Sequence, residues 1–191
     1  QVEQGGKTTV SAHDLHNIVR SLPEQPIRLA TRPLEGQLEI RCDAVDFQCR
    51  LSTLPADEFP SRVELSPEVT YSHQVEDMLE LIDRTIFAVS TEETRYYLGG
   101  VFLECNEGEN MRAVATDGHR LALAETTAPN GFVLPKGQIL PRKMLGELRK
   151  MLDKKSGVVD FGFQNKRVVF RFLSQSLVSL LVEGSFPDYR Q

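Results

Sequence analysis

Two stretches of the chain repeat one order of apolar and polar residues, and this repeat constrains the fold more than any other feature. The first copy covers residues 9–60 and the second covers residues 139–187. Each begins with a helical pattern whose apolar residues recur at the spacing that lines one face of an α-helix. Equivalent apolar residues lie 130 positions apart: they are Leu15, Ile18 and Leu22 in the first copy and Leu145, Leu148 and Leu152 in the second.

Three segments with the alternation typical of strands follow each helical pattern, and each copy closes on a Phe-Pro pair, at residues 59–60 and 186–187. The strand segments are residues 27–30, 38–42 and 47–51 in the first copy and residues 158–163, 168–172 and 177–182 in the second. One helix followed by three strands, repeated along the chain, predicts an α+β fold with mostly antiparallel sheet.

The stretch between the two copies predicts another unit of the same kind. A strand at residues 63–73 is followed by a helical pattern over residues 75–90. Three further strands are expected at residues 97–105, 111–116 and 119–125. A Pro-Ser turn at residues 60–62 separates two periodic segments. We therefore expect one domain over residues 1–62 and a second over residues 63–191.

The composition excludes several classes of protein. The chain has 191 residues, of which 40% are hydrophobic and 26% are charged, a balance that predicts a globular core and argues against disorder. No apolar run is long enough to cross a bilayer and the first residues do not resemble a signal peptide, so we expect no membrane association. A net charge of −5 excludes a chain that coats nucleic acid over its whole surface but permits a local basic face.

The three cysteines, Cys42, Cys49 and Cys105, are an odd number without close pairing. This usage is typical of the reducing cytosol and predicts a cytoplasmic protein. None of the four histidines lies near a cysteine in sequence, so we expect no metal site.

Residues 141–152 predict a helix with one apolar and one cationic face. Pro141 fits the first helical position, where its missing N–H costs nothing. Met and Leu residues fall on one side of the helix, and the cations on the other side are Arg142, Lys143, Arg149, Lys150 and Lys154. Such a face is either solvated or makes salt-sensitive, sequence-independent contacts with the phosphates of a nucleic acid.

Residues 111–125 predict a β-hairpin, because Asp117-Gly118 suits a two-residue type I′ turn. The turn is flanked by polar residues and then by apolar ones, which are Thr116, His119 and Arg120 followed by Leu121 and Leu123. A bare Asp-Gly hairpin is a solvated surface element, whereas the whole string around this turn is much more specific.

The string Val-Ala-Thr-Asp-Gly-His-Arg-Leu-Ala-Leu at residues 114–123 resembles a signature of the bacterial sliding clamp family, the beta subunit of DNA polymerase III. Three further segments resemble clamp segments in the same order and spacing: residues 51–60, 95–98 and 186–190. The resemblance implies a DNA clamp fold, with sheets outside and helices facing a DNA hole. It also implies that the chain holds the second half of the first clamp domain and the whole middle domain, with the third domain absent.

The resemblance implies a processivity factor of bacterial DNA replication, with no catalytic residues, cofactor or metal. At full length it would be a ring-shaped homodimer that encircles double-stranded DNA without sequence preference. The implied protein partners are the polymerase III alpha subunit, the clamp loader and other proteins that carry a clamp-binding motif.

The resemblance also implies two groups of site residues. One wall of a peptide-binding cleft corresponds to Leu98, Thr116, Gly118, His119, Arg120, Leu121 and Pro187. DNA-binding positions correspond to Arg95, Tyr96, Tyr97, Arg142, Lys143, Arg149 and Lys150. In the cleft, apolar side chains would receive aliphatic anchors and the polar groups would orient the peptide. Because the opposite wall belongs to the absent third domain, we expect this chain to bind peptides weakly.

The helical pattern over residues 75–90 departs from a uniformly cationic DNA-facing surface. Its polar side carries Glu76, Asp77, Glu80 and Asp83 against Arg84 alone. Since these carboxylates would repel phosphate, either the contact with DNA is loose and uneven or the acids point toward the rim.

Two other functions remain open from the residues themselves. In an enzyme, Asp117 and His119 would form an acid–base pair, but the turn accounts for Asp117 and no Ser or Cys nucleophile signature accompanies His119. A peptide-docking adaptor without DNA encirclement would use the same hairpin. The basic helix distinguishes the adaptor from a clamp, because only the clamp requires that cationic face.

Overall fold

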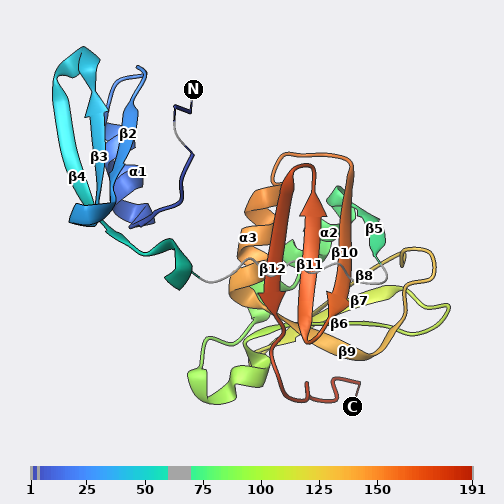
Figure 1. Cartoon of the computed structure of the whole chain (residues 1–191). Helices are drawn as coiled ribbons and strands as arrows, with labels where there is room; N and C mark the ends of the chain where they lie inside the picture. Colours follow the sequence, from blue (N-terminus) through green and yellow to red (C-terminus); the bar gives the residue numbers. More distant parts are fainter. Residues whose placement is uncertain (1, 4, 60–69, 191) are drawn as a thin grey trace. The chain divides into compact units, whose positions relative to one another are not determined.

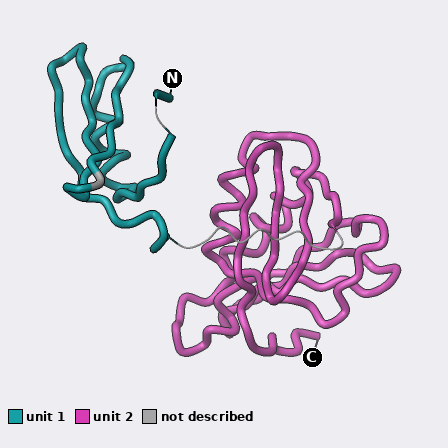
Figure 2. The backbone as a smooth tube through the Cα atoms, viewed as in Figure 1, with its two compact units in different colours: residues 1–63 teal, residues 64–191 magenta. Residues whose placement is uncertain are grey.

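The computed structural model describes residues 2–3, 5–59 and 70–190 (Figure 1). The chain forms two compact units, Gln1–Val63 and Glu64–Gln191 (Figure 2). The predicted domain boundary at residues 60–62, and most of the strand predicted at residues 63–73, lie outside the described residues.

The described part of unit 1 has one α-helix and a four-stranded antiparallel sheet. Its elements are β1 (Thr9–Val10), α1 (Ala12–Ser21), β2 (Arg28–Arg32), the 3-10 helix η1 (Pro33–Glu35), β3 (Gln37–Cys42), η2 (Asp43–Val45), β4 (Phe47–Leu54) and η3 (Ala56–Glu58). The strands lie in the order β1-β4-β3-β2. Ser11 caps α1, since its hydroxyl accepts a hydrogen bond of 3.3 Å from the backbone N–H of Asp14.

The core of unit 1 is small. Leu38, Ile40 and Cys42 of β3 are buried, whereas α1 contains no buried residue. The apolar stripe of this helix is therefore only partly covered in unit 1.

Within its described residues, 70–190, unit 2 contains two α-helices and two four-stranded sheets. Its elements are β5 (Tyr71–Gln74), α2 (Val75–Asp83), η4 (Ile86–Ala88), η5 (Glu93–Leu98), β6 (Gly100–Cys105), β7 (Met111–Thr116), β8 (Leu121–Thr126), β9 (Leu134–Pro141), α3 (Arg142–Leu152), β10 (Val158–Gln164), β11 (Arg167–Phe172) and β12 (Gln175–Leu180). One sheet has the order β12-β11-β10-β5 and the other β8-β7-β6-β9. The predicted α+β organisation with antiparallel sheets is confirmed.

The two repeats of unit 2 exchange their first strands. Strand β5 precedes α2 in the chain but pairs with β10 of the following repeat. Strand β9 precedes α3 but pairs with β6 of the preceding repeat. Each sheet therefore needs both repeats, and the repeats form a single folding unit.

One buried cluster joins both sheets and both helices of unit 2. It includes Leu103, Ala113, Met144, Leu148, Phe161 and Phe170. Figure 1 shows β10, β11 and β12 side by side in front of α2, and α2 and α3 contact each other. Full burial of a side chain such as Leu148 contributes roughly 2–3 kcal/mol to folding.

The helix predicted over residues 75–90 is shorter than expected, because α2 ends at Asp83. Thr85 leaves helical geometry with φ −126°, and its hydroxyl donates a 2.6 Å hydrogen bond to the carbonyl oxygen of Leu81. Val89 is nevertheless buried. The apolar periodicity depends on which side chains are buried, and not on whether they lie in a helix. It therefore continues past the end of α2, where the chain is no longer α-helical but still buries side chains.

Three other predictions about unit 2 were wrong in detail. The strand expected from residue 97 begins at Gly100, since residues 97–98 belong to η5. Strand β9 was not predicted, because Pro135, Lys136 and Gly137 hide its alternation. Pro141 is the N-cap of α3 and the last residue of β9 rather than the first helical residue.

Candidate binding surfaces

Three rows of side chains cross the outer face of the β8-β7-β6 sheet. The opposite, inner face supplies core residues such as Met111, Ala113 and Ala115. Because side chains alternate along a strand, the pairing register defines the outer rows, which are Leu121–Thr116, Leu123–Val114–Phe102 and Glu125–Arg112–Glu104. The outer face is thus apolar and hydroxylated near the 117–120 loop and charged at its other end.

The loop between β7 and β8 differs from the predicted type I′ turn. Thr116 pairs with Leu121, so four residues form the loop, and among them only Gly118 has a positive φ, of 91°. The Asp117 carboxylate accepts 3.0 Å hydrogen bonds from the backbone N–H groups of His119 and Arg120. A side-chain cap of this kind builds a turn without a left-handed residue at Asp117.

Hydrogen bonds hold this loop on both sides. The Thr116 hydroxyl donates to the Arg120 carbonyl at 2.7 Å and accepts from the Gly118 N–H at 3.1 Å. The backbone hydrogen bond from His119, and to a smaller extent the one from Arg120, lowers the pKa of Asp117 below its usual value. The loop therefore carries a carboxylate that is already committed to the turn.

Arg120 ties the loop to the segment after α2. Its Nε donates to Asp117 at 3.0 Å, and its Nη2 donates to the carbonyl oxygen of Phe87 at 2.7 Å. The guanidinium also lies 5.7 Å from the centre of the Phe87 ring. Phe87 is 54% exposed, and sequence reasoning did not predict it as a site residue because it falls within the predicted 75–90 helix.

Arg95 lies against the loop as well. A Cβ atom added to Gly118 would be 2.7 Å from Nη1 of Arg95, so the Arg95 side chain would have to shift, and the positive φ of 91° at residue 118 itself favours glycine. The Arg95 guanidinium also donates two hydrogen bonds to Glu92, at 2.8 Å and 2.6 Å. The structure thus brings Arg95, which was predicted to bind DNA, next to the predicted peptide-binding loop.

The two tyrosines after Arg95 differ in exposure. Tyr96 is 60% exposed, whereas Tyr97 is partly buried. Their rings form an edge-to-face pair with centres 5.8 Å apart. A Cβ atom at Gly184 would be 3.1 Å from Tyr97, so the chain after β12 passes close to this pair.

The apolar residues predicted for the cleft are not equally accessible. Leu98 is buried, at 4% exposure, so it supports the surface from below, whereas Leu121 is 49% exposed. Pro187 is exposed. Leu123 is 45% exposed on the same face as Leu121, and the alternation of residues 121–125 was the signal that could have added it to the prediction.

Helix α3 presents its cations outward, but not all of them are free of carboxylates. Arg149 Nε lies 2.5 Å from Asp83 Oδ1 of α2, and Lys150 Nζ lies 2.9 Å from Glu147 Oε1. Arg142 and Lys143 are exposed and form no ion pair with any residue of the described segments. The unpaired positive charge of α3 is therefore concentrated at its N-terminal end.

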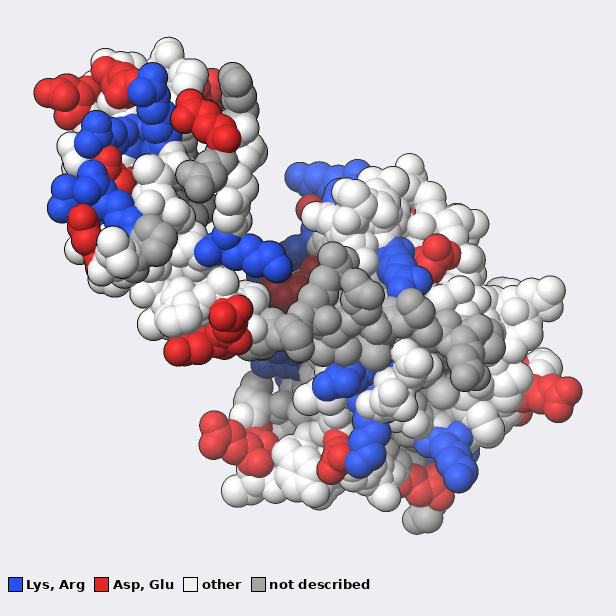
Figure 3. All heavy atoms as spheres, in the orientation of Figure 1, with Lys and Arg blue, Asp and Glu red and all other residues white. Residues whose placement is uncertain are grey.

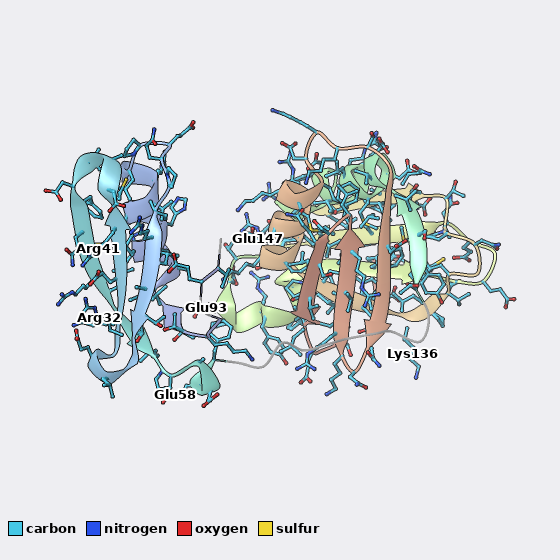
Figure 4. All side chains as sticks on the ribbon, turned by 45° about the horizontal axis from the view of Figure 1, so that its top comes forward. Arg32, Arg41, Glu58, Glu93, Lys136 and Glu147 are labelled. Atoms are coloured by element: carbon cyan, nitrogen blue, oxygen red, sulfur yellow. The ribbon has the colours of Figure 1, made fainter. Side chains whose placement is uncertain are left out.

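The charged surface is mixed elsewhere. Figure 3 shows Lys and Arg side chains interspersed with Asp and Glu on the face of each unit that it presents. In unit 1, buried Glu39 forms ion pairs with Arg32, Arg41 and Arg50, and Figure 4 shows Arg32 and Arg41 on one side of the sheet. Figure 4 also labels Glu147 on α3, the carboxylate that pairs with Lys150.

The described residues contain neither a metal-binding cluster nor a membrane-spanning helix. Within residues 2–3, 5–59 and 70–190, no three His, Cys, Asp or Glu side chains lie close enough together to hold a metal ion. No helix in that part of the chain is both long and apolar enough to span a membrane.

Family models match almost the whole chain. The model of the DNA polymerase III beta subunit N-terminal domain matches residues 1–64, and that of the beta subunit central domain matches residues 73–188.

Curated relatives agree with these models. The beta sliding clamp of Caulobacter vibrioides is 40% identical over 193 residues, which cover 99% of this chain and 51% of the relative. The beta sliding clamp of Escherichia coli K12 is 40% identical over 196 residues, which cover 100% of this chain and 51% of the relative. The chain thus spans about half the length of the curated relatives it matches.

Solved structures show the same fold. The DNA polymerase sliding clamp of Caulobacter crescentus is 39% identical with a TM-score of 0.87, and the match covers 100% of this chain and 52% of that one. The sliding clamp of Bartonella birtlesii bound to griselimycin is 36% identical with a TM-score of 0.86, covering 100% of this chain and 51% of that one.

Proposed function

The chain belongs to the DNA polymerase III beta subunit family, and on that premise we propose that the protein acts as a sliding clamp of bacterial DNA replication. It encircles duplex DNA as a ring-shaped homodimer and tethers polymerase III and other clamp-binding proteins through a peptide-binding cleft. Residues 1–62 belong to its N-terminal clamp domain and residues 63–191 form its middle domain. The protein works in the cytoplasm.

One observation supports this proposal: the cationic helix α3 and the outer face that carries the 117–120 loop are separated by one sheet, although Arg95 of the predicted DNA-binding set lies beside the loop. Helix α3 contacts β9 of the β8-β7-β6-β9 sheet, and its Leu145 and Leu148 belong to the buried cluster that includes the inner-face residues of this sheet. The loop at residues 117–120 and the exposed leucines of β8 belong to its edge and outer face. A protein built this way can hold DNA on one side and a protein tail on the other without competition for space.

In the proposed cleft, the outer sheet face supplies apolar contact and the loop supplies polarity. Leu121, Leu123 and Pro187 receive the aliphatic or aromatic anchors of a linear peptide. His119 and the loop backbone orient the peptide through hydrogen bonds. Since Asp117 and Phe87 hold Arg120 in place, its guanidinium approaches the peptide with little loss of side-chain entropy.

On the opposite side, Arg142 and Lys143 contact the phosphates of the duplex. Lysine and arginine contacts with the DNA backbone carry no sequence information, and a clamp that must move along DNA requires exactly that lack of preference. Because Arg149 and Lys150 already have carboxylate partners, they add less to the attraction. The contact is therefore weak enough for sliding, while the closed ring prevents dissociation.

The protein is an accessory subunit, and we infer that it has no catalytic activity of its own. The Asp117 carboxylate is engaged by two backbone N–H groups and by Arg120, so the turn accounts for it. The alternative function, a peptide-docking adaptor, would use the same outer face without any contact between α3 and DNA.

Topological trapping of the complete protein on DNA tests the proposal. The complete protein is loaded by its own clamp loader onto nicked circular DNA, and the circle is then cut. Release of bound protein on cutting is the expected result. Retention on linear DNA with free ends would contradict encirclement and favour an affinity-bound adaptor.

A second experiment tests the cleft in this chain. Griselimycin is titrated into ¹⁵N-labelled protein, and the expected result is a set of saturable amide shifts at residues 116–123 and 187. Leu121→Asp should abolish them, whereas Leu173→Asp, at a more exposed leucine after β11, should not. Equal shifts in both variants would mean that the binding surface is elsewhere.

A further inference from the structure

Glu104 is a buried carboxylate to which neither candidate surface gives a role. It lies on the outer face of β6, in the row Glu125–Arg112–Glu104, and is 4% exposed. A carboxylate buried to this extent is stable only when donors surround it. The identity of those donors therefore indicates its role.

Two of its three donors come from the segment that follows β12. The hydroxyl of Tyr189 donates to Glu104, and Nη2 of Arg190 lies 2.5 Å from Glu104 Oε1. Arg112 of β7 supplies the third donor, at 3.3 Å. A single carboxylate thus joins the sheet to a segment about 85 residues further along the chain.

Arg112 extends this network across the sheet. Its Nη1 donates to the Tyr189 hydroxyl at 3.1 Å, and its Nε donates to Glu125 of β8 at 2.5 Å. The charged row therefore begins at the edge strand β8 and ends under Tyr189. Glu125 contacts Arg112 but makes no hydrogen bond to the C-terminal segment within the described residues.

A second, apolar anchor holds the same segment a few residues earlier. The ring of Phe186 stacks on Phe102 with centres 4.9 Å apart and 7° between the planes. Phe102 is in turn packed over Gly137, where an added Cβ would lie 2.1 Å from the ring. Pro187 of the proposed cleft thus lies between a stacked ring at residue 186 and a charged anchor at residues 189–190.

We propose that Glu104 is a positioning residue of the peptide-binding cleft, which holds residues 186–190 on the outer sheet face and thereby fixes Pro187 as part of the cleft wall. The proposal rests on the proposed function of that cleft. Glu104 is in the third outer row and Leu121 is in the first, so they are about four residues, roughly 13 Å, apart along the strands, and they are also on strands two places apart in the sheet. Glu104 therefore acts through the segment and not by touching the peptide.

Binding of griselimycin to this chain, measured by calorimetry, tests the proposal. Glu104→Gln keeps the shape and removes the charge, and we expect it to weaken binding about fivefold to tenfold. Tyr189→Phe should have a similar effect. The matched control is Glu125→Gln, at the other end of the same row, which should change the affinity less than twofold.

A double-mutant comparison separates positioning from a general loss of structure. If Glu104 acts through Pro187, Glu104→Gln should weaken binding little further in a Pro187→Ala background but by its full factor in a Leu121→Ala background. Hydrogen exchange of residues 182–190 should accelerate in Glu104→Gln while exchange in α2 and α3 is unchanged. Glu104→Asp keeps the charge, so it should retain more of the affinity than Glu104→Gln.

The outcomes are distinguishable. If the unaltered chain binds griselimycin and Glu104→Gln binds it equally well, the positioning role is overturned and the cleft stands. The positioning role would also be overturned if Glu104→Gln lost the same affinity in all backgrounds, or if Glu125→Gln lost as much as Glu104→Gln, because either result would indicate general destabilisation. If the unaltered chain shows no binding at residues 116–123, the proposed cleft fails and the positioning role fails with it.

Discussion

The guanidinium of Arg149 on α3 is paired with the carboxylate of Asp83 at the end of α2, with Nε and Oδ1 2.5 Å apart. This pair connects the basic helix to the acidic one. The side chain of Asp83 faces α3, and Glu80 is paired with Arg84 at 2.6 Å. Two of the acids that would repel phosphate are therefore already partnered by arginines.

This pairing predicts an order of importance among the cations of α3. Each cation that contacts a phosphate contributes about 0.9 to the slope of log affinity against log salt. We expect Lys143→Gln or Arg142→Gln to lower that slope by about 0.9 and Arg149→Gln to lower it less. The test measures the affinity for a labelled random-sequence duplex by fluorescence anisotropy, at salt concentrations from about 50 to about 200 mM.

Asp83→Asn is the complementary variant, because it frees Arg149 without changing α3. It should raise the affinity for the duplex and restore the sensitivity to Arg149→Gln. Equal effects of Arg149→Gln with and without Asp83 would show that the ion pair does not limit the contact with DNA.

The 117–120 loop should respond to acid through Asp117. Hydrogen bonds from the His119 and Arg120 backbone lower the pKa of this carboxyl below its ordinary value of 3.8. A group whose folded pKa is lowered stabilises the fold fully above its unfolded pKa and loses this contribution as the pH falls through the folded pKa. The loop should therefore be intact above about pH 5 and loosen only below pH 3.8.

An NMR titration of the His119 amide from neutral to acidic pH measures this. We expect the chemical shift of this amide to change with a midpoint below pH 3.8, and we expect no such change in Asp117→Asn. Asp117→Ala should also weaken griselimycin binding at neutral pH, because the loop loses its cap. A midpoint at or above the ordinary value would contradict the hydrogen bonds assigned to this carboxylate.

Buried His73 of β5 should make the stability of unit 2 depend on pH near neutrality. The side chain is 6% exposed, and burial lowers its pKa below 6.5, with Asp77 opposing the shift. The unfolded chain therefore binds a proton in a range where the folded chain does not, so stability is full above pH 6.5 and falls as the pH decreases below it.

The slope of this loss is at most about 1.4 kcal/mol per pH unit. Urea unfolding at several pH values between roughly 7.5 and 5.5, a range that spans the ordinary histidine pKa, measures this slope. His73→Gln cannot gain a proton, so its unfolding free energy should change less over the same range. Identical slopes for the two proteins would assign the dependence to other groups.

The order of elements could be predicted from the sequence because the apolar period records which face of each element is buried. Strands β3 and β11 are equivalent in the repeat: they cover residues 37–42 and 167–172, an offset of 130 residues. The resemblance carried by residues 114–123 is confirmed by the family models. The end of α2 at Asp83 could not be predicted, because the apolar pattern continues past it although Thr85 has left helical geometry.

The candidate site was predictable only in part, for a different physical reason. Its loop residues form one continuous string, but their support comes from distant parts of the chain. Arg120 depends on the Phe87 carbonyl, and Pro187 depends on Glu104 through Tyr189. Contacts between such remote positions leave no periodic signal in a single sequence, so neither Phe87 nor Glu104 was identified.

The repeat also predicts a difference in stability between equivalent helix positions. Leu148 of α3 is fully buried, whereas α1, which carries its equivalent Ile18, has no buried residue. Leu148→Ala creates a cavity and should cost about 3 kcal/mol. Ile18→Ala removes a partly exposed side chain and should cost about 1 kcal/mol or less. Hydrogen exchange read separately in the two units, with urea unfolding as the reference, measures both costs. Equal losses would mean that the apolar stripe of α1 is covered in solution by something that packs on it as the core of unit 2 packs on α3.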